Sequence, residues 1–292
     1  MTRQDGRAGI VLMLFTTFVF AMQDGISRYL AETYNVLTVV MIRYWFFAAF
    51  VLLRSASLPG GIRRVAATRQ AGLQVLRGVL LVAEVCVMVL AFTYLGLVES
   101  HAIFAAYPLI VAALSGPILG EAVGWRRRLA IGVGFIGVLI ILRPGLKVFE
   151  PAALIAVASA TMFALYGLLT RFAARQDSAE TSFFYTGVAG ALAITLVAPF
   201  WWSPMQGAAD WAWMGALCVT GALGHFTLIK AYELSEAATI QPFAYFQLVF
   251  AALLGVTVFG EVLEIPVVLG AGVIIASGLF TLWRARLSDR SG

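Results

Sequence analysis

Charged residues interrupt several of the long apolar runs of this sequence. Asp24, Arg43 and Glu84 each stand inside such a run, well away from its ends. A charge in the middle of an apolar segment is costly unless it pairs or faces water, so such residues are candidates for binding a charged ligand. With a rise of about 1.5 Å per helical residue, Arg43 lies level with both acids. Two interpretations stay open: a structural ion pair, or a charged wall that meets a substrate carboxylate or ammonium group.

Histidines and neutral polar residues at similar depths extend this set. Of the two histidines, His225 lies deep in an apolar run, whereas His101 is expected near the outer end of another. A buried histidine is more often a packing residue, but His225 combines depth with an imidazole that titrates near neutral pH, which makes it the candidate proton carrier. Pro108 and Pro242 could bend helices and gate access. The predicted substrate-binding residues are Gln23, Asp24, Arg43, Glu84, Tyr107, Tyr166, His225 and Gln247.

The composition decides which elements position these side chains. The chain has 292 residues, of which 61% are hydrophobic and 12% are charged, whereas soluble proteins average nearer one half and one quarter. Its apolar runs are long enough for membrane-spanning helices of about 20 residues. We therefore expect an all-α polytopic membrane protein with ten transmembrane helices. They are predicted at 8–29, 35–54, 73–95, 99–119, 127–143, 152–173, 181–200, 211–232, 237–258 and 264–283.

The basic residues indicate how these helices are oriented. A net charge of +5 would suggest nucleic acid as a partner of a soluble protein, but here most of the 20 lysines and arginines lie between apolar runs. With ten spans, most of them fall on the side that holds both termini, so the positive-inside rule places both termini in the cytoplasm. We expect a lipid bilayer and no nucleic acid as partner, and a monomer.

The two halves of the sequence share ordered similarities. YPLIVAALSGPILGE at 107–121 matches FQLVFAALLGVTVFGE at 246–261, and FAMQDGISRYLA at 20–31 matches FALYGLLTRFAA at 163–174. This order predicts a duplication, with repeats over 1–145 and 146–292. Five helices per repeat is an odd number, so the second repeat should be inverted in the membrane. Inverted repeats are typical of secondary transporters, which hold substrate between the halves.

The repeated Gly-Glu pair ends a helix in each half. Gly120 and Gly260 fit helix C-caps. We expect Glu121 and Glu261 at the water interface, where each precedes the next helix and suits its N-terminal dipole.

These features resemble a known family. The resemblance is based on four features: Ala91-Phe92-Thr93-Tyr94, the partly matching Ile229-Lys230-Ala231-Tyr232, the Ala-Ala-Leu runs and the terminal Gly-Glu pairs. Over nearly the whole chain, they look like the EamA-type drug/metabolite transporter superfamily, and within it the ten-helix aromatic amino-acid exporters. The resemblance implies a multi-pass carrier of the bacterial inner membrane that exports amino acids, aromatic or other neutral ones favoured.

Other function classes lack their motifs. No His-x-x-x-His or Cys-x-x-Cys metal set, no paired aspartates on one span and no Gly-rich phosphate loop occur in the sequence, so we expect no enzyme, no metal and no cofactor. A channel would need a repeated filter motif or a ring of charges. The alternative within the carriers is another metabolite, such as S-adenosylmethionine or a nucleotide sugar. Coupling to protons stays open.

Overall fold

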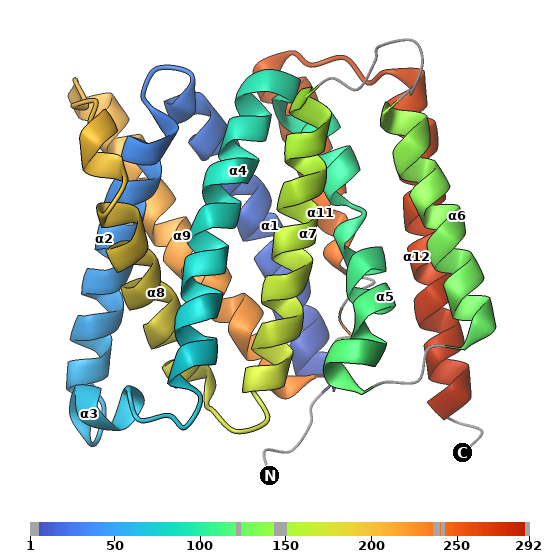
Figure 1. Ribbon diagram of the computed structural model, residues 1–292. Coiled ribbons are helices and arrows are strands. Elements are labelled where there is room, and N and C mark those ends of the chain that lie inside the picture. The colour runs from blue at the N-terminus through green and yellow to red at the C-terminus, as the bar shows by residue number, and fades with distance from the viewer. Residues whose placement is uncertain (1–5, 121–123, 143–150, 236–239, 241–242, 290–292) are drawn as a thin grey trace.

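In the computed structural model the chain forms a bundle of α-helices (Figure 1), and the structure describes residues 6–120, 124–142, 151–235, 240 and 243–289. No β-strand occurs over these residues. The helices are α1 (Gly6–Ala31), α2 (Val36–Ser57), α3 (Gly61–Val65), α4 (Ala71–Phe104), α5 (Tyr107–Leu119), α6 (Trp125–Leu142), α7 (Pro151–Ala173), α8 (Ala179–Thr195), η1 (Ala198–Trp201), α9 (Ala208–Leu234), α11 (Phe246–Phe259) and α12 (Ile265–Asp289).

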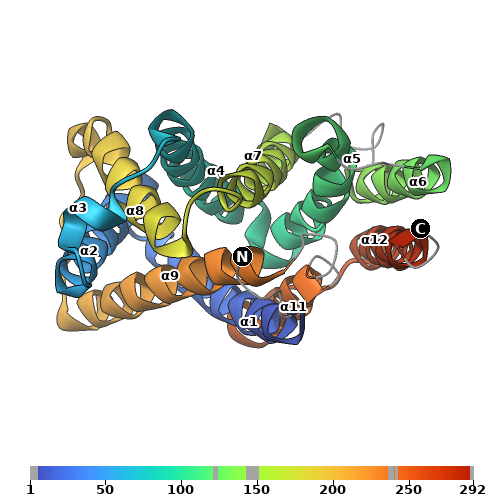
Figure 2. The ribbon, with the colours of Figure 1, turned by 90° about the horizontal axis from the view of Figure 1, so that it is seen from below.

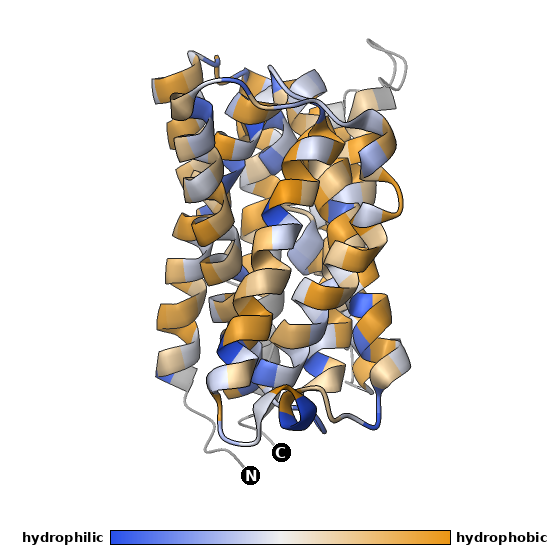
Figure 3. Ribbon diagram, turned by 90° about the vertical axis from the view of Figure 1, so that its left-hand side faces the viewer, coloured by the Kyte–Doolittle hydropathy of each residue, from blue (hydrophilic) through white to orange (hydrophobic). Residues whose placement is uncertain are grey.

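The surface of the bundle suits a bilayer. Five of the described helices, α1, α2, α4, α7 and α9, are long and apolar enough to cross a membrane, and α5, α6, α11 and α12 contain shorter apolar stretches. Large apolar side chains such as Leu53 and Leu196 are mostly exposed, and apolar residues cover the outside of the bundle (Figure 3). A soluble protein rarely exposes apolar patches of this extent. The predicted all-helical polytopic class is therefore confirmed.

Six helices contribute side chains to a common cavity, namely α1, α2, α4, α7, α9 and α11. Helix α1 packs against α9 and α11, and α4 packs against α7 and α8. Helices α6 and α12 pair at one end of the bundle (Figure 2). The start of α1 and the end of α12 lie at the same end of the bundle, and α7 runs in the direction opposite to α1 (Figure 1).

A glycine changes the direction of α4 inside the membrane-spanning region. Gly96 has φ 77° and ψ −178°, a conformation open essentially to glycine alone. Residues 97–104 continue as helix beyond it, and α5 starts at Tyr107. The prediction of one helix over 99–119 was therefore wrong, because Ala105 and Ala106 separate two shorter helical segments. The break predicted between 95 and 99 lies at Gly96.

Glu261 stabilises this break from the other half of the chain. Its Oε1 accepts a hydrogen bond from the Leu97 amide and its Oε2 one from the Val98 amide, both at 2.7 Å. These are N–H groups that a helix start leaves without an internal partner. Glu261 also forms an ion pair with Arg28 of α1. The helix start that Glu261 caps is the second segment of α4, not that of α12 as expected. Glu121 lies outside the described residues.

Other boundaries also differ from the prediction. The helix predicted over 181–200 ends at Thr195 and is followed by the short η1, and the described part of the helix predicted over 237–258 is chiefly α11, which begins at Phe246. Pro108 lies in the first turn of α5, where a missing N–H costs nothing. It does not kink a continuous helix as expected. Pro242 lies outside the described residues.

Candidate substrate site

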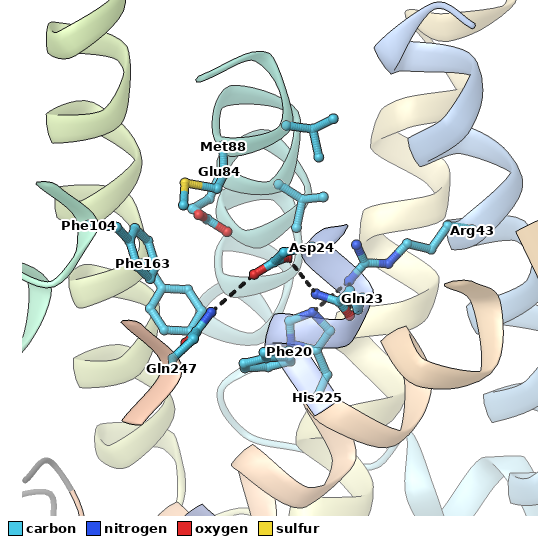
Figure 4. Close-up of a pocket in the computed structure, with 12 residues that line it drawn as sticks. Phe20, Gln23, Asp24, Arg43, Glu84, Met88, Phe104, Phe163, His225 and Gln247 are labelled. Carbon is cyan, nitrogen blue, oxygen red and sulfur yellow. Dashed lines mark hydrogen bonds between the residues drawn. The ribbon is translucent and has the colours of Figure 1, made fainter. Parts of the chain in front are cut away.

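A cavity lies among the central helices, with side chains from α1, α2, α4, α7, α9 and α11 on its wall (Figure 4). Six of the predicted site residues line it, and all six are at most 8% exposed. The lining residues are Phe20, Gln23, Asp24, Arg43, Glu84, Val85, Met88, Val89, Phe104, Phe163, His225 and Gln247. The structure thus brings together polar groups that are separated by up to 224 positions in the sequence.

Arg43 carries the positive charge of this wall. Its Nη2 donates to Gln23 Oε1 at 3.0 Å and lies 3.2 Å from His225 Nε2. Among the described residues, no carboxylate lies within the 4.0 Å of an ion pair with Arg43. The structural ion pair that the sequence suggested with Asp24 or Glu84 is therefore absent, which leaves a buried guanidinium that only neutral groups contact.

The Arg43 contact fixes the hydrogen-bonding role of His225. A guanidinium only donates, so His225 Nε2 accepts and the proton of the neutral ring sits on Nδ1. That Nδ1 is buried and has no hydrogen-bond partner among the described residues. A second proton on His225 would remove the acceptor and place two cations side by side. This arrangement speaks against His225 as the proton carrier.

Of the two carboxyl groups that line the cavity, Asp24 has more hydrogen-bond donors around it than Glu84. Its Oδ1 accepts from Gln23 Nε2 at 3.3 Å, and its Oδ2 accepts from Gln247 Nε2 at 3.1 Å. The same Oδ2 lies 3.1 Å from His101 Nε2. The Arg43 contact to Gln23 Oε1 requires the Gln23 amide nitrogen to face Asp24, so the orientation of this amide is consistent with both bonds. Gln23 thereby links the positive and negative groups of the cavity (Figure 4).

Glu84 supplies a second carboxyl group from α4. Its Oε1 accepts a hydrogen bond from Ser159 Oγ of α7 at 2.7 Å, and the side chain is buried. The cavity therefore presents one guanidinium and two carboxyl groups to the same space. No group of three or more His, Cys, Asp or Glu side chains capable of holding a metal occurs in the described part of the chain.

Phenylalanine rings form the apolar side of the cavity. Phe163 contacts Phe104 and Phe20 with ring centroids 5.3 Å and 6.3 Å apart. Phe20 also packs against the imidazole of His225 at 5.0 Å. Such rings provide flat apolar surface with a preferred edge or stacked geometry for another aromatic group.

The cavity is contracted in this conformation. Only about 30 Å³ of it is open to water-sized groups, enough for one or two water molecules. Small-molecule sites commonly measure roughly 300–1,000 Å³. Admitting a metabolite therefore requires the surrounding helices to separate.

Two predicted residues lie outside this lining. Tyr107 borders a smaller neighbouring cavity together with His101 and Pro108. Tyr166 is fully buried and lies beneath the guanidinium of Arg77, 5.2 Å from ring centroid to Cζ. Sequence reasoning did not place His101 at the site, and spacing carries no signal for its contact with a residue 77 positions away.

The sequence matches a known family of transporters over most of its length. A model of the EamA-like transporter family matches residues 7–143 and 150–283. The chain belongs to the EamA-like transporter family. Members of this family are transporters, in line with the expectation that the chain is not an enzyme.

Curated relatives cover almost the whole chain. It is 28% identical over 284 residues to an S-adenosylmethionine uptake transporter of Rickettsia prowazekii, a match spanning 97% of this chain and 95% of the relative. It is 31% identical over 291 residues to a riboflavin transporter of Vibrio cholerae, again spanning 97% and 95%. A solved crystal structure superposes with a TM-score of 0.68 at 16% identity, covering 96% of this chain and 99% of that one. That structure supports the fold alone.

Proposed function

We propose that this EamA-family transporter imports a cationic, zwitterion-bearing metabolite with a heteroaromatic ring, and that S-adenosylmethionine is the substrate. The observation that carries the proposal is that one guanidinium, two carboxyl groups and three phenylalanine rings face one buried cavity. A site of this kind fixes the ends of a ligand with charges and its body with apolar surface.

The chemistry of S-adenosylmethionine matches the cavity group by group. Its carboxylate would bind Arg43, and its ammonium and sulfonium groups would lie between Asp24 and Glu84. Its adenine ring would pack among Phe20, Phe104 and Phe163, which already contact one another. The relatives named for uptake of this metabolite support it over the amino-acid export that the resemblance implied.

Riboflavin is the second candidate, because a relative that is 31% identical is named for it. Its isoalloxazine ring suits the phenylalanines, and its hydroxyl groups suit the amides of Gln23 and Gln247. It lacks a carboxylate for Arg43 and a cation for the two acids. The two candidates therefore differ in whether they need the charged residues.

We propose alternating access between two inverted five-helix halves as the mechanism, with ten spans and both termini cytoplasmic in a bacterial inner membrane. Separate family matches over 7–143 and 150–283 support the repeat. The packing supports it too, because the α1–α9 and α1–α11 contacts have counterparts in α7–α4 and α7–α5. Substrate would lie between the halves, at the cavity of Asp24 and Arg43.

The test is counterflow in proteoliposomes that contain the purified protein. Vesicles preloaded with unlabelled S-adenosylmethionine should accumulate the labelled compound, and unlabelled riboflavin or phenylalanine outside should compete weakly. Accumulation of riboflavin alone would favour the second candidate. Accumulation of phenylalanine or tryptophan, but not of S-adenosylmethionine, would show that the substrate is an amino acid. Empty liposomes provide the background.

A further inference from the structure

The hydrogen bonds of His101 and Asp24 contain a proton that the transport cycle can use. His101 Nδ1 lies 2.9 Å from the Leu97 carbonyl oxygen. A carbonyl oxygen only accepts, so Nδ1 carries a hydrogen. The second ring nitrogen, Nε2, lies 3.1 Å from Asp24 Oδ2, and this contact also requires a hydrogen. The pair therefore holds one proton more than a neutral imidazole and a carboxylate.

The other contacts of Asp24 show where this proton resides. The amides of Gln23 and Gln247 both donate to its carboxylate, so both oxygens of Asp24 already act as acceptors. The extra proton therefore sits on His101 Nε2, as an imidazolium beside a carboxylate. A neutral imidazole carries a hydrogen on only one of its two nitrogens, so loss of that proton would leave either the Asp24 contact or the Leu97 contact without a hydrogen.

The pair joins two separate helical segments. Asp24 belongs to α1, whereas His101 belongs to the segment 97–104, between the Gly96 turn and the break at Ala105 and Ala106. His101 is 1% exposed and stacks on Phe92 at 5.2 Å. The other titratable or charged groups around the pair are Glu84 from α4, Arg43 from α2, His225 from α9, Tyr107 from α5 and Tyr245 beside α11.

We infer that Asp24 and His101 together form a proton-binding site, and that a cationic substrate displaces its proton. This inference rests on the proposed function, because Asp24 is also the carboxylate that a substrate ammonium or sulfonium group would meet. Substrate binding replaces the imidazolium as the counter-charge of Asp24. The Nε2–H bond of His101 breaks, its proton leaves to water, and one positive charge has entered for one that left.

The first test needs no substrate. The chain has only two histidines, so protein grown with isotope-labelled histidine gives two imidazole rings in nitrogen NMR, and His225→Gln assigns them. His101 should show both nitrogens protonated, and Asp24→Asn should change this pattern. A neutral His101 ring that Asp24→Asn leaves unchanged would overturn the inference.

The second test links the proton to transport. Adding S-adenosylmethionine to purified protein in weakly buffered solution should release about one proton per molecule bound. The ratio should fall toward zero in His101→Gln and stay unchanged in Asp210→Asn, whose carboxylate binds the Tyr34 hydroxyl at 2.5 Å away from the cavity. Binding without proton release refutes the proton site and leaves the proposed function intact. Absence of binding refutes S-adenosylmethionine as the substrate. The nitrogen NMR of His101 then still decides whether the proton site exists.

Discussion

Two buried arginines, Arg77 and Arg43, have opposite surroundings. Arg77 is fully buried in α4, where its Nε and Nη2 donate to Thr170 Oγ1 at 3.1 and 2.8 Å and its Nη1 donates to Gln74. Gln74 in turn donates to Asp177 Oδ2 at 2.7 Å. All three donor nitrogens of Arg77 thus have partners that belong to the protein.

Arg43 is nearly as buried, at 3% exposure, but the hydrogen bonds described for it come from Nη2 alone. Arg43 lines the candidate substrate cavity, and Arg77 is not among the residues that line it. Burying a charge is costly unless its hydrogen bonds are satisfied. The comparison teaches that burial alone does not identify a binding residue, whereas a buried charge with incomplete partners at a cavity does.

The largest expected effect is on transport by Arg43→Gln. If this guanidinium binds the substrate carboxylate, its loss should reduce uptake of S-adenosylmethionine at least about thirtyfold, the cost of truncating one member of a buried charged pair. Labelled uptake in proteoliposomes measures this. Arg54→Gln, on the same helix but outside the cavity, is the matched control. Equal uptake by Arg43→Gln and the unmodified protein would remove Arg43 from the site.

The same change at the other arginine should affect stability instead. Arg77→Gln leaves Thr170 and Gln74 without their donor, at a cost of about 1–3 kcal/mol in the free energy of unfolding. Denaturation in detergent measures the loss, and substrate affinity of the remaining folded protein should not change. A variant that is as stable as the unmodified protein yet fails to bind substrate would reverse the assigned roles.

A third arginine, Arg28, differs from Arg43 and Arg77 because it has carboxylate partners. Substitutions of these partners should have the smallest effects on stability. Glu261→Gln should cost about 1–2 kcal/mol, since it removes charge-assisted bonds to two backbone amides and to Arg28. Glu32→Gln removes the exposed partner of Arg28 at 3.3 Å and should cost under about 1 kcal/mol. Both losses are measured by the same denaturation curves, and equal losses would show that the Glu261 cap adds nothing beyond an exposed ion pair.

The sequence predicted the polar lining well for a physical reason. Asp24, Arg43 and Glu84 stand out because a charge is rare in an apolar span, and that rarity can be seen without a structure. Arg77 did not stand out in the same way, because it lies near the start of the helix predicted at 73–95. Its burial depends on Thr170, which is 93 residues away.

Contacts between distant segments are what the sequence could not supply. Nothing in the spacing of Asp24 and His101 indicates that they meet, and Tyr166, which was placed at the site by its match to Gln23, lies beneath Arg77 instead. The position of the break in α4 depends likewise on a carboxylate from the other half of the chain. Long apolar runs predicted the helices, but the break within α4 is capped by tertiary hydrogen bonds from Glu261.

The Gly96 turn limits the substitutions that the chain can tolerate at two distant positions. A Cβ on residue 96 would lie 2.7 Å from Glu261 Oε1, so glycine is required there both by the backbone and by the carboxylate beside it. Residues 96 and 261 lie in different halves of the chain, and a substitution at either one disrupts the contact between them. Mutation at this contact is therefore constrained jointly in the two parts of the chain.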